Sequence, residues 1–129
     1  MKTLALFVLF LTAIAAPAHA KSLRVIGTTG YLSEWELNGN VTESWSGRVG
    51  EFSGPVTVRH IGLCSQSGPQ EKVAELQLQM VRLGSLFQFR ATMTMNGAKC
   101  TFSGKLSDTY NGLMDCTDAK GVPLTLSIK

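Results

Sequence analysis

Three successive segments in the middle of the chain alternate strictly between apolar and polar residues: 73–80, 87–95 and 100–106. In the second segment Phe87, Phe89 and Met93 lie on one side of the alternation, while Gln88 and Arg90 lie on the other. A helix would space its apolar residues three and four apart, so this period of two predicts β-strands. Each strand then turns one face to a core and the other to water, as in an antiparallel sheet.

Further strands are expected on both sides of this central part. Segments with the same period are residues 31–41, with Trp35 and Leu37 facing inward, 55–64, with His60 and Cys64 on one face, 110–116, and 122–129. A short strand is expected near residues 23–26. Residues 45–54 contain Gly47, Gly50 and Gly54 and show no clean period, so they predict a twisted or bulged strand, or a loop.

Turn residues between the segments set the register of the hairpins. Asn96-Gly97 is the pair favoured in two-residue hairpin turns, and it predicts Met95 opposite Ala98 and Phe89 opposite Gly104. A turn at Leu83-Gly84 pairs Arg82 with Ser85 and Leu78 with Phe89. A connection at 107–109 pairs Leu106 with Tyr110, Gly104 with Gly112 and Cys100 with Cys116. A turn centred on Ala119 pairs Cys116 with Val122. Apart from Arg82 with Ser85 beside the turn, these pairs keep apolar residues or glycines on one face, as a correct register must.

The fold class predicted from these hairpins is all-β, a small antiparallel up-and-down β-barrel of about seven or eight strands. Neighbour-to-neighbour hairpins favour a barrel because closure removes exposed sheet edges. In architecture this resembles the lipocalin or avidin type. Gly30 and Trp35 are not spaced as in the lipocalin G-x-W motif, and no named family is indicated.

The first 20 residues have the pattern of a secretory signal peptide. A basic start at Lys2 precedes an apolar run that ends in the small-x-small sequence Ala18-His19-Ala20. The run is shorter than the roughly 20 apolar residues that a membrane span needs. We therefore expect cleavage after Ala20, a single β-barrel domain over residues 21–129, no membrane anchor after cleavage, and a periplasmic or secreted location.

The charge pattern gives little support to nucleic-acid binding. The chain has 12 Lys and Arg against 9 Asp and Glu, and loss of the leader with Lys2 would leave a net charge of +2. The basic residues are scattered along the sequence rather than gathered in a run. Nucleic acid is therefore not an expected partner.

Three cysteines remain after the leader: Cys64, Cys100 and Cys116. In an oxidising compartment one disulfide with one thiol left over is the default. The register places Cys100 directly opposite Cys116, within the Cα separation that a disulfide accepts. We expect this pair to be bonded and Cys64 to be free; the alternative is that barrel closure brings Cys64 across the lumen. No spacing typical of a zinc site is present, so neither a metal nor a cofactor is expected.

Any Ser/His/Asp or Cys/His arrangement would have to use His60, because it is the only histidine after the leader. Cys64, on the same strand face, would lie about 13 Å away at roughly 3.3 Å per residue, too far for a nucleophile and its base. Glu34 and Glu36 share a face opposite Trp35 and Leu37, as expected of a solvated surface. The protein is therefore not expected to be an enzyme.

The inward face contains bulky apolar residues and four candidate positions for binding. Gly104 and Gly112 leave space in the wall, which Phe89 could cover or a small ligand could fill. The candidate ligand contacts are Trp35, His60, Phe89 and Tyr110. An eight-stranded barrel is just wide enough to be filled by side chains or to hold one small ligand.

Two functions follow from this pattern. The first is a non-catalytic binding module for a small apolar ligand at one barrel mouth. The alternative is a protein-binding module that acts through its loops, such as an inhibitor of a secreted hydrolase, since small exported barrels of this size include such inhibitors.

The leader yields the first testable prediction. Protein recovered from the periplasm or medium should begin at Lys21, because the small side chains of Ala18 and Ala20 suit the cleavage site. N-terminal sequencing measures this directly. A chain that still begins with Met1 would contradict the assignment of a leader.

Overall fold

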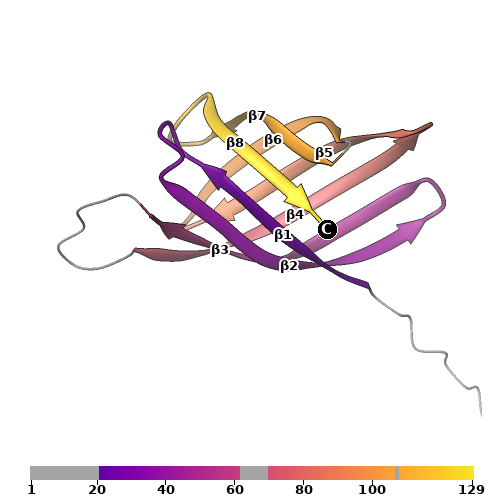
Figure 1. Ribbon diagram of the computed structural model, residues 1–129, viewed down its shortest axis with the longest axis horizontal. Coiled ribbons are helices and arrows are strands. Elements are labelled where there is room, and N and C mark those ends of the chain that lie inside the picture. The colour runs from indigo at the N-terminus through magenta and orange to yellow at the C-terminus, as the bar shows by residue number, and fades with distance from the viewer. Residues whose placement is uncertain (1–20, 62–69, 107) are drawn as a thin grey trace, which may run out of the picture.

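The computed structural model describes residues 21–61, 70–106 and 108–129, and these form a closed, eight-stranded antiparallel barrel (Figure 1). The expected leader, residues 1–20, lies outside the described residues. The strands, in chain order, are β1 (Lys21–Thr29), β2 (Trp35–Ser46), β3 (Val49–His60), β4 (Glu71–Leu83), β5 (Leu86–Met95), β6 (Ala98–Leu106), β7 (Thr109–Cys116) and β8 (Val122–Ile128). The predicted fold class is thereby confirmed.

Each strand pairs with its neighbours in sequence, and β1 also pairs with β8. The closing ladder runs from Val25 opposite Ile128 to Thr29 opposite Leu124. Every strand therefore has a partner on both sides, which is how a barrel avoids the unpaired edges that cause aggregation.

The up-and-down order gives the barrel two distinct ends. The β1–β2, β3–β4, β5–β6 and β7–β8 connections lie at one end, which we call end A; the β2–β3, β4–β5 and β6–β7 connections lie at the other, end B. In Figure 1 end A is on the left and end B on the right, where the β2–β3 and β4–β5 hairpins reach far out.

The barrel interior is packed with the apolar side chains of the alternating pattern. The largest fully buried ones include Leu37, Val58 and Leu76. Four of the residues predicted to face inward lie near the strand ends and are only half-buried against this core: Trp35, Phe87, Met95 and Ile128. Within the described residues, no buried side-chain nitrogen or oxygen lacks a hydrogen-bond partner.

The second strand begins four residues later than residues 31–41 predict. Residues 30–34 form the β1–β2 connection, in which Gly30 and Ser33 take positive φ angles of 102° and 52°. Leu32, which alternation placed in this strand, is 88% exposed. The alternation of apolar and polar residues continues through this connection. The chain must nevertheless change direction here, because β1 and β2 are antiparallel, so these residues cannot be part of a strand.

Residues 45–54, predicted as an irregular strand or a loop, form the end of β2, a tight turn and the start of β3. The turn lies at Gly47 and Arg48, and Gly47 has a φ of 62°. Gly50 then occupies a buried inward position, where an added Cβ would lie 2.8 Å from the indole of Trp45. Because the Trp45 ring fills the space beside Gly50, this inward position holds a glycine instead of an apolar side chain. The period of two is therefore not visible in the sequence here.

The third strand starts earlier and ends earlier than the predicted segment 55–64. It runs from Val49 to His60, with Val56 and Val58 buried as expected. Cys64, placed on its inward face by the pattern, lies outside the described residues.

The register of the β5–β6 hairpin is confirmed. Met95 pairs with Ala98 and Phe89 with Gly104. Asn96 and Gly97 have φ angles of 49° and 79°, and two positive values are what a type I′ turn requires.

The predicted register of the β4–β5 hairpin is wrong by two residues. Leu83 pairs with Leu86, so Leu78 faces Ala91 and Phe89 faces Met80. The turn is Gly84-Ser85 rather than Leu83-Gly84, because the first turn position needs the positive φ of 66° that Gly84 adopts. A shift of two keeps every side chain on its face, so the apolar pattern does not reveal it.

The last hairpin shows the same two-residue error. Met114, not Cys116, pairs with Val122, and Gly112 faces Leu124. The connection is longer than predicted because Cys116 N donates to Ala119 O at 2.7 Å and Gly121 N donates to the Asp115 carboxylate at 3.0 Å.

The β6–β7 ladder contains Cys100 opposite Cys116 and Thr101 opposite Asp115, as the predicted register requires. A disulfide joins the two cysteines, whose Cα atoms are 3.9 Å apart. The remaining predicted pairs, such as Leu106 with Tyr110, do not belong to the hydrogen-bonded ladder. The disulfide therefore fastens this hairpin at end A, where the ladder between β6 and β7 is short.

This pairing predicts the stability of two variants. Cys100→Ala/Cys116→Ala should lower the free energy of unfolding by about 3 kcal/mol, the value expected for a closed loop of roughly 15 residues in the chain-entropy model. Cys64→Ala is the control, and it should leave the free energy of unfolding nearly unchanged. Urea unfolding followed by circular dichroism measures both.

Peptide mapping without reduction gives an independent check of the same pairing. A linked peptide containing Cys100 and Cys116 is expected. A linked peptide containing Cys64, or an equal loss of stability in Cys64→Ala, would contradict the assignment.

Candidate functional site

The end A mouth is built from inward-facing residues next to the connections. Trp35 opens β2 and pairs directly with His60, the last residue of β3. Their rings meet edge to face, with centroids 4.7 Å apart and an interplanar angle of 71°. Both side chains are half-buried, because inward positions at a strand end border solvent.

A cation also lies against the Trp35 ring. Lys72 Nζ is 5.2 Å from the ring centroid, close enough for a cation–π interaction. Lys72 occupies an inward-facing position of β4 and pairs with Val58 of β3. Its side chain therefore reaches the Trp35 ring from the β3–β4 hairpin. Trp35 is thus held by contacts to His60 and Lys72 from two other strands.

A pocket of about 220 Å³ opens beside Trp35. Apolar side chains and the disulfide form most of its wall, with polar groups toward its rim. The lining residues are Thr29, Gly30, Tyr31, Glu34, Trp35, Val58, Met95, Ala98, Cys100, Met114, Cys116, Asp118, Ala119 and Val122. Trp35, Met95 and Met114 offer the large, polarizable surfaces that suit an apolar guest.

Most polar groups of the lining are already engaged within the protein. Thr29 Oγ1 donates to Pro123 O at 2.8 Å, and Tyr31 Oη donates to Lys120 O at 3.0 Å. The Glu34 carboxylate accepts from Leu32 N at 2.8 Å. A carboxylate can accept more than one hydrogen bond. The groups of the pocket that can still accept hydrogen bonds from a ligand are therefore the carboxylates of Glu34 and Asp118.

The four predicted ligand contacts come together in two pairs rather than in one group. Trp35 and His60 meet at end A, and only Trp35 belongs to the pocket lining. Phe89 and Tyr110 are buried and pack edge to face, with centroids 4.9 Å apart. A role in ligand binding stays a prediction for all four.

Tyr110 fills the space predicted beside the two glycines. An added Cβ at Gly104 would lie 2.9 Å from Tyr110 Cε2 and 3.7 Å from Phe89 Cε1, and one at Gly112 would meet the Tyr110 hydroxyl. That hydroxyl lies 3.4 Å from Ser103 O and 3.3 Å from Leu113 O and can donate to either. Tyr110 therefore covers the glycines more closely than Phe89, the aromatic that the sequence suggested.

Several lining residues escaped the sequence analysis because they sit at strand ends or in connections. Ala98 directly follows the Asn96-Gly97 turn, and Ala119 and Asp118 lie in the β7–β8 connection. The available signal was topological: in an up-and-down barrel, alternate connections meet at the same end. Small inward residues next to those connections mark the mouth.

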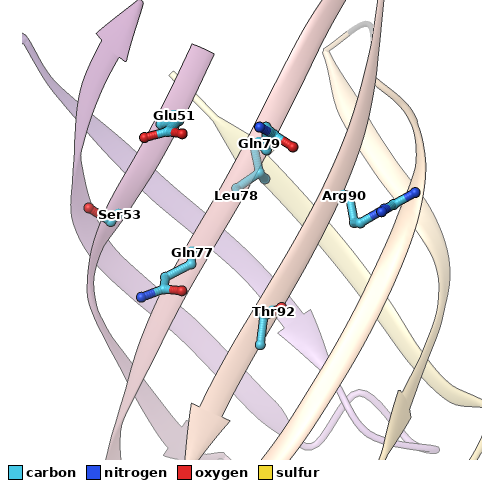
Figure 2. Close-up of a pocket in the computed structure, with 7 residues that line it drawn as sticks. All are labelled: Glu51, Ser53, Gln77, Leu78, Gln79, Arg90 and Thr92. Atoms are coloured by element: carbon cyan, nitrogen blue, oxygen red, sulfur yellow. The ribbon is translucent and has the colours of Figure 1, made fainter. Parts of the chain in front are cut away.

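A second hollow, of about 440 Å³, lies on the outer wall of β3, β4 and β5 (Figure 2). Its side chains are mostly polar: Glu51, Ser53, Gln77, Leu78, Gln79, Arg90 and Thr92. Figure 2 shows them spread over three strands, with Arg90 pointing away from the others. Since they do not converge, this hollow resembles the solvated outer face of an antiparallel sheet, and the end A pocket is the better candidate.

Residues 21–61, 70–106 and 108–129 contain neither a cluster of metal ligands nor a membrane-spanning helix. No three His, Cys, Asp or Glu side chains there lie close enough to hold a metal ion. No helix in this part of the chain is long and apolar enough to cross a bilayer.

Comparison with known protein families, with curated proteins and with solved structures finds no match for this chain.

Proposed function

We propose that the protein is an exported, non-catalytic binding module that takes a small apolar ligand in the end A pocket. The observation that carries the proposal is the apolar pocket beside Trp35, at the mouth of a barrel whose interior is otherwise packed. An apolar recess of this kind gains free energy when a guest removes its surface from water.

The size of the pocket limits the ligand. At about 220 Å³, it is smaller than the roughly 300–1,000 Å³ typical of sites for drug-sized molecules. A short alkyl chain or a single aromatic ring fits this range. Glu34 and Asp118 at the rim favour a polar end that donates hydrogen bonds or carries a positive charge.

Two observations favour an exported location. The Cys100–Cys116 disulfide is the kind of bond that forms and persists in oxidising compartments. The sequence of residues 1–20 has the leader pattern described above. Together they fit a ligand met in the periplasm or outside the cell.

We also propose that the protein is not an enzyme. The His60 ring packs on Trp35, an aromatic partner that cannot act as a nucleophile or orient a base. A general base needs the proton it abstracts within hydrogen-bond reach. His60 is therefore better explained as a support for the Trp35 ring.

Protein binding through the end A loops is the second candidate function. Tyr31 and Leu32 in the β1–β2 connection are 65% and 88% exposed, and Ile61 is 48% exposed. Ile61 N donates to Glu34 O at 2.8 Å, which places the three residues on neighbouring loops. Exposed apolar side chains grouped in this way are typical of interaction sites.

Ligand binding is tested by fluorescence quenching with a bromohexanol, a small apolar probe whose bromine quenches tryptophan on contact. In a Trp45→Phe background Trp35 is the only tryptophan left. Quenching should saturate with probe concentration, because the probe occupies the pocket beside the indole.

A pocket-filling variant and a matched control sharpen the test. Ala98→Leu should weaken the probe affinity at least about tenfold, because the larger side chain would occupy space that the probe needs. A single extra or missing methylene in an apolar pocket already changes binding by about this factor. Thr101→Leu adds bulk on the exposed outer side of the same strand and should leave the affinity unchanged. Quenching that rises linearly, with the same slope in all three proteins, would contradict ligand binding at end A.

A further inference from the structure

The β4–β5 hairpin projects beyond its neighbour at end B. The last β3–β4 pair is Val49 with Val81, and Arg82 N donates to Arg48 O at the turn of the β2–β3 hairpin. The β4–β5 hairpin continues past this point to the Leu83–Leu86 pair and the Gly84-Ser85 turn. Figure 1 shows both hairpins extending past the ends of β6, β7 and β8.

The projecting part carries large apolar side chains on both of its faces. Leu83, Leu86 and Val81 lie on the outer alternation and are 55%, 42% and 36% exposed. Phe87 lies on the inner alternation, and Trp45 of the adjoining hairpin packs against it with ring centroids 6.1 Å apart. We call these five residues the end B tip.

Basic groups are placed directly beside the apolar ones. The Arg82 guanidinium lies 5.8 Å from the Trp45 ring centroid and 5.5 Å from that of Phe87. Arg48 stands exposed in the turn of the neighbouring hairpin. Aromatic rings, aliphatic side chains and arginines in this combination suit the zone between lipid headgroups and acyl chains.

Charge is distributed unevenly between the two ends of the barrel. End B carries more basic than acidic side chains: Lys21, Arg24, Arg48, Arg82, Lys105 and Lys129 against Glu43, Glu51 and Asp108. End A has the reverse excess: Glu34, Glu36, Glu71, Glu75, Asp115 and Asp118 against Arg59, Lys72, Lys99 and Lys120. An anionic surface would therefore attract end B and repel end A.

We propose that the end B tip docks on the anionic surface of a phospholipid bilayer, with the β4–β5 hairpin immersed among the headgroups. A hairpin with apolar side chains on both faces and an arginine beside them can be surrounded by lipid headgroups, whereas a flat protein partner would cover only one face. Peripheral binding of this kind combines buried apolar area with attraction of basic residues to anionic lipid. Docked in this way, the protein holds the end A pocket open toward the aqueous side.

The experiment is flotation of the exported protein with vesicles. Vesicles that contain phosphatidylglycerol should bind the protein, and pure phosphatidylcholine vesicles should bind it at least about tenfold more weakly, because the charge attraction is lost. Binding to the anionic vesicles should weaken as salt is raised, since screening shortens the reach of the charges.

Matched substitutions locate the contact. Leu83→Asp/Leu86→Asp should weaken vesicle binding at least about tenfold, since it puts charges where the proposal puts lipid. Val73→Asp/Leu113→Asp is the control, because these residues are 64% and 61% exposed but lie away from the tip. Circular dichroism of each variant verifies that the barrel is folded.

A second measurement does not depend on these variants. In a Trp35→Phe background, brominated phosphatidylglycerol should quench Trp45 emission when the tip enters the headgroup layer. The proposal is overturned if anionic vesicles neither bind the protein nor quench Trp45, or if both double variants bind equally well. Concentration-dependent dimerisation without lipid, abolished by Leu83→Asp/Leu86→Asp, would also overturn it, since a second copy would then occupy the tip.

Discussion

The ladder between β1 and β8 is the contact on which the rest of the molecule depends. It converts a meander of hairpins into a barrel, and only a closed barrel encloses the inward side chains of all eight strands. Gly27 lies in the middle of this ladder, where an added Cβ would press on the backbone of Thr125 and Leu126. The first and last strands can approach closely there because residue 27 has no side chain.

The fold could be predicted from the sequence because burial of one face enforces a period of two, but that period tolerates some errors. A slip by one residue would expose the core, whereas a slip by two keeps every side chain on its face. The β4–β5 and β7–β8 registers were therefore set by turn geometry at Gly84 and by the hydrogen bonds of the β7–β8 connection, which no alternation records. At Gly50 the pattern failed because Trp45 from a neighbouring strand fills an inward position.

The candidate site was less predictable than the fold because it depends on which strand ends meet. Trp35 was recognisable as a large inward aromatic, but its neighbours Ala98, Ala119 and Asp118 carry no signal of their own in the sequence. Phe89 and Tyr110, equally prominent in the sequence, are buried and pack against each other, apart from the pocket lining. The two ends consequently differ in character: end A holds a pocket with an acidic rim, and end B an apolar tip flanked by arginines.

Amide hydrogen exchange of the β1–β8 ladder tests the central claim, closure of the barrel, most directly. The amides that join Val25–Thr29 to Leu124–Ile128 should exchange as slowly as those between β3 and β4, because both ladders open only when the barrel unfolds. Rapid exchange in β1 and β8 beside slow exchange in β3 and β4 would show an open sheet. The enclosed interior and the end A pocket would then both be wrong.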